Sequence, residues 1–142
     1  MNEVTDSEPV KLVVNVDGGA RGNPGPAAIG VSIRDGEGNL VDEFAQRIGQ
    51  ASNNVAEYRA VIAGVRRATE LGATELEVIN DSELVARQLT GAYRVKHEAM
   101  KPLHAEAKAA LDGLREWRIR SVPRAQNARA DELVNEALDG LR

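Results

Sequence analysis

Four acidic side chains of this chain stand where regular structure is expected to start or stop. Asp17 and Asp81 each follow a short apolar run, whereas Glu57 and Asp131 fall near the beginning of segments with helical periodicity. Carboxylates packed together repel one another, and their pKa values rise unless a cation lies between them. Mg²⁺ prefers oxygen ligands, and two such ions about 3.5–4 Å apart activate a water and stabilise a leaving oxygen in phosphoryl transfer. The four acids are therefore candidate ligands of a phosphoryl-transfer metal site.

Each acid also has a structural interpretation when it is taken alone. Asp81 precedes Ser82 and could cap a helix. Glu57 and Asp131 are favourable charges near helix N-termini, and Asp17 could be an ordinary turn residue. The positions of all four together favour chemistry, because strand C-termini and helix N-termini gather at one edge of an open α/β sheet, where ligands bind.

The first half of the chain predicts an antiparallel meander. Strands are expected over Leu12–Asp17, Ala28–Arg34 and Leu40–Ile48, each bounded by turn residues. Gly18–Pro26 holds four glycines and two prolines in nine residues, so we expect a shaped turn there rather than helix or strand. Asp35–Asn39 contains two glycines and is typical of a hairpin turn.

The second half predicts helices that alternate with strands. Expected first are a helix from Ser52 or Asn53 to Leu71, a strand over Leu76–Asn80, and a short helix capped by Asp81–Ser82 that Gly91 ends. An ambiguous segment over 92–101 precedes a helix over Pro102–Arg115, a strand over Trp117–Val122, a loop over Pro123–Asn127 and a helix over Arg129–Leu141. This order predicts an α/β fold with a five-stranded mixed sheet, an antiparallel meander followed by parallel strands, flanked by helices.

Composition sets further bounds. The 142 residues include no cysteine, which excludes disulfides, iron–sulfur clusters, thiolate zinc sites and cysteine nucleophiles. The 18 basic and 22 acidic residues give a net charge of −4, unlike a protein that grips nucleic acid by bulk charge. No apolar run approaches the ~20 residues of a membrane helix, and the acidic start is unlike a secretory signal. We expect a disordered acidic tail over 1–9, one domain over 10–142, no membrane contact, and a cytoplasmic monomer.

Four sequence blocks resemble ribonuclease H, type 1, a member of the retroviral-integrase-like nuclease superfamily. The resemblance runs from Lys11 to Leu141, and the blocks follow one another in the family's order. They are Val16–Pro26 (VDGGARGNPGP), Ser52–Tyr58 (SNNVAEY), Asn80–Ser82 (NDS), and Val122–Asp131, which carries Pro123, Arg124, Asn127 and Ala130. The resemblance implies the five-stranded mixed sheet of that family, which the periodicity predicts independently.

The resemblance implies an endonuclease that hydrolyses the RNA strand of RNA–DNA hybrids and leaves a 3′-hydroxyl and a 5′-phosphate. It implies Mg²⁺ as the cofactor, in a two-ion site where Mn²⁺ can substitute. By the same resemblance Asp17, Glu57, Asp81 and Asp131 are the catalytic, metal-binding acids, and each matches its motif in residue type. An active enzyme with an RNA–DNA hybrid as its substrate is therefore expected.

Substrate contacts are also implied by the resemblance. The residues are Gly18, Gly19, Ala20, Asn23, Ser52, Asn53, Asn54 and Arg124. A 2′-hydroxyl distinguishes RNA from DNA, and backbone amides or asparagine side chains can bind it. Ser52 and Asn53, ahead of a helix N-terminus, are well placed to hold a phosphate of the DNA strand.

Three features depart from the family pattern. Many relatives have a histidine in the loop before Asp131; this chain has none there, and Arg124 is expected to take over part of that role. Glu83 adds an acid beside the third block, which would weaken substrate binding or shift metal affinity. The basic handle of some members is absent, since that region holds only Arg94, Lys96, Lys101 and Lys108 among acids. Hybrid affinity is therefore expected to be lower, or to come from another domain or partner.

Three other functions stay open on the sequence. Another integrase-superfamily nuclease, such as a junction resolvase or an exonuclease, would share the fold but not the glycine-rich loop or the Asn53–Glu57 block. A hybrid-binding module without catalysis would not need four intact acids. The third is an acidic α/β domain of a larger assembly. Replacing Asp17 by asparagine separates them, because a nuclease would lose cleavage and keep hybrid binding.

Overall fold

The first three strands form the antiparallel half of the sheet. The computed structural model describes residues 8–141, so most of the acidic tail expected over 1–9 lies outside the described residues. β1 (Lys11–Ala20), β2 (Gly25–Asp35) and β3 (Leu40–Ala51) follow one another through short connections and pair antiparallel. The predicted meander is confirmed, and each strand is longer than expected.

The prediction that Gly18–Pro26 contains no strand is wrong. β1 continues through Gly18, Gly19 and Ala20, which pair with residues 27–29 of β2. A Cβ atom on Gly18 would lie 2.1 Å from the carbonyl oxygen of Ala56, so glycine is what lets β1 pass this close to the helix after β3. The turn itself is confined to residues 21–24, where Gly22 adopts a φ of +92°.

Helices and parallel strands alternate in the second half of the chain. They are α2 (Asn53–Glu70), β4 (Glu75–Asn80), α3 (Glu83–Leu89), α4 (Lys101–Asp112), β5 (Glu116–Ser121) and α5 (Ala128–Leu138). β4 pairs parallel with both β1 and β5, which gives the sheet order β3-β2-β1-β4-β5. The predicted fold class is confirmed, and the structure shows that the first and fourth strands are parallel neighbours.

Several boundaries differ from the prediction. α4 ends at Asp112, with Gly113 as its C-cap, and α5 ends at Leu138, with Asp139 as its C-cap and Gly140 next. Single 3-10 turns over Glu98–Met100 and Arg124–Asn127 precede these helices. The second turn lies where a loop was expected, because a compact turn brings the chain from β5 directly into α5.

Two serines begin the helices nearest the end of β4. Ser52 Oγ accepts a hydrogen bond from the backbone N–H of Val55 at 3.2 Å, and Ser82 Oγ accepts one from Val85 at 3.2 Å. Both are N-cap residues. Because Ser82 rather than Asp81 caps α3, the Asp81 carboxylate is left for another use.

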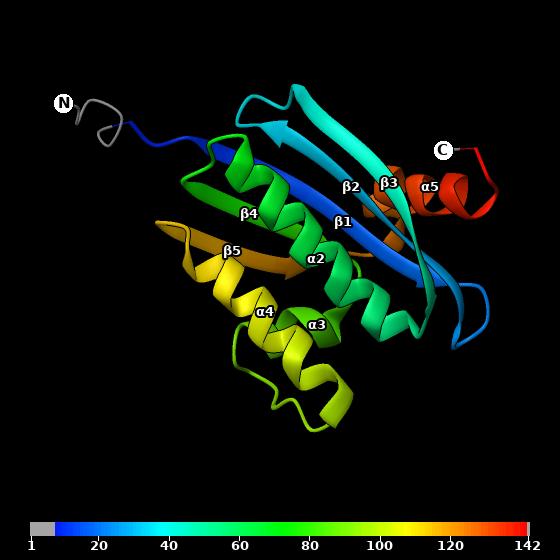
Figure 1. The fold of residues 1–142 in the computed structure, drawn as a ribbon. Coiled ribbons are helices and arrows are strands. Elements are labelled where there is room, and N and C mark those ends of the chain that lie inside the picture. The colour runs from blue at the N-terminus through cyan, green and yellow to red at the C-terminus, as the bar shows by residue number, and fades with distance from the viewer. Residues whose placement is uncertain (1–7, 142) are drawn as a thin grey trace.

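The helices cover the two faces of the sheet unequally. α2, α3 and α4 lie over one face, and α5 lies alone on the other (Figure 1). The main core fills the α2 face, whereas α5 packs on a small cluster of Ala28, Val134 and Ala137. A Cβ atom on Gly30 would lie 2.4 Å from the carbonyl oxygen of Ala130, so the helix rests directly on the β2 backbone.

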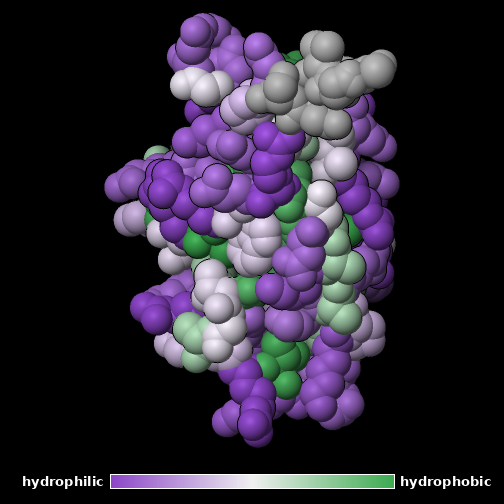
Figure 2. All heavy atoms as spheres, turned by 90° about the vertical axis from the view of Figure 1, so that its left-hand side faces the viewer, coloured by the Kyte–Doolittle hydropathy of each residue, from purple (hydrophilic) through white to green (hydrophobic). Residues whose placement is uncertain are grey.

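The end of the sheet where the parallel strands begin is mostly hydrophilic. Figure 2 looks onto this end and shows apolar residues there only in small separate areas. None of the helices within residues 8–141 is long and apolar enough to cross a membrane. The polar site lies at the opposite end, where β1 and β4 finish.

Candidate active site

Three carboxylates meet at the sheet edge where β1 and β4 end. Asp17 lies near the end of β1, Asp81 directly follows β4, and Glu57 projects from the second turn of α2. One oxygen of each lies within 4.8 Å of the others. Because β1 and β4 are parallel neighbours and α2 packs on β1, the fold itself brings these side chains together. The acids were expected to gather at one edge of the sheet, and Asp17, Glu57 and Asp81 do so.

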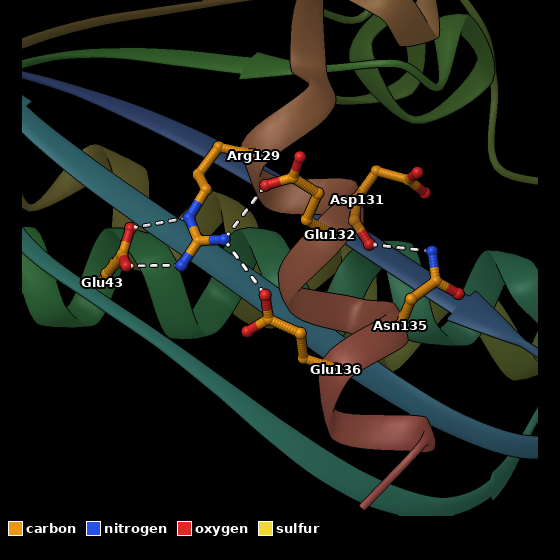
Figure 3. A network of polar contacts seen from close by, with 6 residues as sticks. All are labelled: Glu43, Arg129, Asp131, Glu132, Asn135 and Glu136. Atoms are coloured by element: carbon orange, nitrogen blue, oxygen red, sulfur yellow. Dashed lines mark hydrogen bonds and ion pairs between the residues drawn. The ribbon is translucent and has the colours of Figure 1, made fainter. Parts of the chain in front are cut away.

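Asp131 reaches the same cavity from the other face of the sheet. It stands in the first turn of α5 and lines a cavity of about 510 Å³ together with Asp17, Glu57 and Asp81. Figure 3 shows its carboxylate directed away from the ion pairs that Arg129 makes. The site thus consists of three clustered acids and a fourth that a separate element delivers. The structure brings all four to one place, and their catalytic role stays a prediction.

Burial makes the central pair of acids difficult to ionise. It raises the pKa of Asp17 far above its usual range, and the charge of Glu57 and a hydrogen bond with that side chain raise it further. Burial also raises the pKa of Glu57 to about 7, although hydrogen bonds with Asp17 and with the N–H of Gly18, 2.7 Å from Oε1, oppose the shift. Without a cation the two carboxyls therefore share a proton near neutral pH.

Asp81 carries a buried oxygen that accepts no hydrogen bond. Its Oδ2 atom has no such partner among the described residues, and Arg124 Nε lies 3.6 Å away as an ion pair. Buried polar atoms are nearly always paired, so an orphaned carboxylate oxygen in a polar cavity is suited to a cation. The negatively charged groups that line the cavity are carboxylates, and carboxylate oxygens are suitable ligands for the hard ions Mg²⁺ and Mn²⁺.

Six of the eight predicted substrate residues line the cavity. They are Gly18, Gly19, Ala20, Asn53, Asn54 and Arg124. Asn23 and Ser52 support the wall instead. Ser52 Oγ caps the start of α2. Asn23 Oδ1 accepts the backbone N–H of Asn53 at 2.9 Å, and Asn53 Oδ1 accepts that of Ala20 at 2.9 Å. These two bonds tie the glycine-rich segment to the start of α2. Contacts of all eight residues with a substrate stay predictions.

Arg124 and Glu83, two of the departures from the family pattern, differ in whether they line the cavity. Arg124 lies at the cavity beside Asp81, where a residue that replaces the missing histidine would be needed. Glu83 is not among the residues that line the cavity. Its carboxylate pairs with Arg87 at 2.7 Å on the exposed surface of α3, so its charge is partly offset.

The other residues that line the cavity were not predicted as site residues from the sequence. They are Arg21, Ser82, Val134, Asn135 and Leu138. Arg21 joins the glycine-rich turn to α5, because its Nη1 pairs with Asp139 at 2.7 Å and its Nη2 donates to Asn135 at 3.4 Å. Arg21 stands in the first sequence block and could have been singled out there. The α5 residues arrive through tertiary packing, for which the sequence holds no local signal.

Asn127 connects the start of α5 to β1 beside the site. Its side chain is buried; Nδ2 donates to the carbonyl oxygen of Val16 at 2.9 Å, and Oδ1 accepts from Asn15 Nδ2 at 2.9 Å. Val16 precedes Asp17, and Asn127 precedes Asp131 by four positions. This amide therefore links the two segments that carry these acids. Asn127 stands in the last sequence block, where no positioning role was predicted for it.

Known proteins match this chain over most of its length. A family model described as Reverse transcriptase-like matches residues 15–137. Bifunctional protein Rv2228c of Mycobacterium tuberculosis is 46% identical over 92% of this chain, which spans 36% of that protein. Ribonuclease HI of Halobacterium salinarum is 46% identical over 87% of this chain and 62% of its own length. The chain thus spans only part of these two relatives.

Solved structures share the fold at similar identity. RNase H1 of Halobacterium salinarum superposes with a TM-score of 0.88 and 44% identity, over 94% of this chain and 99% of that one. LC11-RNase H1, isolated from compost and solved in complex with an RNA/DNA hybrid, gives a TM-score of 0.86 and 43% identity, over 92% and 98%. With the family match and the convergence of the acidic side chains, these likenesses show that the chain belongs to the ribonuclease H family.

Proposed function

We propose that this chain is a metal-dependent endonuclease that hydrolyses the RNA strand of RNA–DNA hybrids and leaves a 3′-hydroxyl and a 5′-phosphate. The observation that carries the proposal is the group of three carboxylates within 4.8 Å at a polar cavity. Family membership supports the substrate class, as does the hybrid in the complex of LC11-RNase H1.

Asp17, Glu57, Asp81 and Asp131 would hold two divalent ions, Mg²⁺ by preference and Mn²⁺ as a substitute. When bound, such ions activate the attacking water and stabilise the leaving oxygen. The chain keeps the carboxylates close and buried, which costs free energy in the metal-free protein. The N–H of Gly18 orients Glu57 before any ligand arrives.

The wall that would face the substrate offers amide groups. Asn53 uses its side-chain oxygen on Ala20, so its exposed NH₂ group can donate to an acceptor such as a 2′-hydroxyl. The N-terminus of α2 favours negative charge, and a phosphate of the DNA strand would lie there. Arg124 is 77% exposed beside Asp81, so its guanidinium can reach a phosphate of the cleaved strand.

Asp17→Asn is expected to abolish cleavage and leave hybrid binding intact. Asparagine keeps the size of the side chain but removes the charge that holds the ions. A loss of several kcal/mol of transition-state stabilisation lowers kcat by about 10²–10³-fold. Cleavage of a 5′-labelled RNA strand in a hybrid measures the first effect, and fluorescence anisotropy measures the second.

Glu37→Gln, in the exposed turn between β2 and β3, is the control and should cleave like wild type. Wild-type cleavage by Asp17→Asn would contradict the catalytic role of the acidic cluster. A folded wild-type protein that binds the hybrid and cleaves nothing with either metal would instead indicate a binding module.

The metal-free protein is expected to lose stability as the pH rises. On folding, the pKa of Asp17 moves from 3.8 to about 10 and that of Glu57 from 4.5 to about 7. Because these two groups bind more protons in the folded chain than in the unfolded chain, their contribution to stability is present at low pH. This contribution is lost as the pH rises from the pKa values of the unfolded chain to those of the folded chain.

Thermal unfolding in EDTA from pH 5 to pH 9 measures this effect. The Tm of Asp17→Asn should exceed that of wild type by an amount that grows with pH and reaches about 5 °C. Saturating Mg²⁺ should raise the Tm of wild type more than that of the variant. Parallel curves of Tm against pH for the two proteins would show that the repulsion is absent.

Arg124→Ala is expected to lower cleavage about tenfold, a barrier increase of about 1.4 kcal/mol, without changing the Tm. Exposed ion pairs contribute only about 0–1 kcal/mol to folding, so the loss would be in the reaction. Arg118→Ala is a matched control, because Arg118 of β5 is 71% exposed, lies 3.6 Å from Glu77 of β4 and does not line the cavity. Initial rates at saturating and limiting hybrid measure the effect, and equal rates for the two variants would refute the role of Arg124.

A further inference from the structure

Helix α5 packs closely on the backbone of the sheet. Its buried residues lie against β1, β2 and β3, and Leu133 is fully buried among them. Beneath them are small residues, with Gly30 under the carbonyl oxygen of Ala130 and Gly19 under the side chain of Val134. This packing fixes how near α5 lies to the sheet. Asp131 is not one of these buried residues, so its position also depends on the polar contacts that hold the helix in place.

Arg129 provides such a contact at the first turn of α5. Its Nη2 and Nε donate to the two carboxylate oxygens of Glu43 on β3, at 2.7 and 3.1 Å. Its Nη1 donates to Glu132 at 3.0 Å and to Glu136 at 3.2 Å, both on α5 itself. Figure 3 shows this guanidinium between the strand and the helix. A bidentate ion pair of this kind fixes the relative orientation of the two side chains as well as their distance.

Arg129 and Asp131 project from opposite sides of α5, as Figure 3 shows. Residues two positions apart differ by about 200° around a helix. A roll that separates Arg129 from Glu43 therefore also moves the Asp131 carboxylate in the cavity. The far end of the helix is held independently, because Arg47 Nε donates to the carbonyl oxygen of Ala137 at 2.9 Å.

The guanidinium of Arg129 is shared between the strand and the helix. It faces three carboxylates, and the Arg129 and Glu43 side chains are only 32% and 21% exposed. Without Arg129, this link from Glu43 on the strand to Glu132 and Glu136 on the helix would be lost.

We propose that Arg129 and Glu43 are positioning residues that set the place of the Asp131 carboxylate at the metal site. The inference rests on the function proposed above, in which Asp131 holds a metal ion. It adds that the affinity of this site depends on an ion pair on the opposite side of α5.

The test compares wild type, Arg129→Gln, Glu43→Gln and Asp131→Asn at a temperature where circular dichroism shows each to be folded. Calorimetric titration with Mn²⁺ measures metal affinity without substrate, and hybrid cleavage with Mg²⁺ measures kcat and KM. In Arg129→Gln and Glu43→Gln the dissociation constant for Mn²⁺ should rise about tenfold and kcat should fall about tenfold, with KM unchanged. Glu43→Gln keeps the size and an acceptor oxygen of the side chain, so a loss in this variant comes from the charge of the pair.

A double variant tests whether the effect passes through Asp131. Adding Arg129→Gln to Asp131→Asn should cause no further loss of Mn²⁺ affinity, because both changes act on one carboxylate. A further loss of similar size would overturn the positioning role.

The neighbouring residue on β3 supplies a matched control. Asp42 pairs with Arg67 of α2 at 2.7 Å on the other face of the sheet, with exposure close to that of the Glu43 pair. Asp42→Asn and Arg67→Gln should leave the Mn²⁺ affinity within about twofold of wild type. Equal losses in the two pairs would show a general effect of stability and overturn the inference.

Two results separate this inference from the proposed function. If wild type cleaves the hybrid and Asp131→Asn weakens Mn²⁺ binding while Arg129→Gln does not, the positioning role is wrong and the nuclease stands. If wild type neither binds Mn²⁺ nor cleaves, both the positioning role and the proposed nuclease function are wrong.

Combining Glu43→Arg with Arg129→Glu should recover most of the Mn²⁺ affinity that the single variants lose, because an arginine on β3 would again face carboxylates on α5. If the Mn²⁺ affinity did not recover, the proposed role of the Glu43–Arg129 ion pair would be contradicted.

Discussion

Repulsion between buried carboxylates is the constraint on which this site depends. Asp17 and Glu57 are shielded from water and hydrogen-bonded to each other, and Asp81 stands close enough to add its own charge. A folded chain that only had to be stable would separate or replace these groups. The fold holds them together at the end of two parallel strands, and in the proposed function divalent cations would turn this cost into binding free energy.

The two faces of the sheet divide the work of building the site. One face carries the large core, and with it the rigid frame of β1, β4 and α2 that fixes three of the acids. The other carries α5, which adds Asp131 and packs closely on Ala28 and Gly30 of β2. Asn127 and Arg129 join that helix to β1 and β3 by polar contacts. Packing and polar contacts thus act together in placing the fourth acid.

Local patterns were enough to predict the order of strands and helices and the mixed sheet, because apolar periodicity reports directly on buried faces. The order of elements placed the acids at one edge of the sheet, and the parallel pairing of β1 with β4 in the structure is what brings Asp17 to Asp81. The glycine-rich segment was mistaken for a turn, since its strand pairing and its contact with Ala56 are made with residues far along the chain. The pair of Glu43 with Arg129 joins residues 86 positions apart, and a charge on a strand carries no mark of its partner. The resemblance supplied roles for motif residues but none for such supports.

The most direct test of a hybrid-specific, metal-dependent nuclease is cleavage of a 5′-labelled RNA strand by the wild-type chain. The RNA is offered in an RNA–DNA hybrid, alone and in duplex RNA, beside labelled duplex DNA, each with Mg²⁺, Mn²⁺ or EDTA. We expect cuts in the RNA of the hybrid that require a divalent metal and carry 3′-hydroxyl ends. Cleavage that persists in EDTA would contradict the assignment of the four acids as metal ligands, and cleavage confined to duplex DNA would contradict the hybrid substrate.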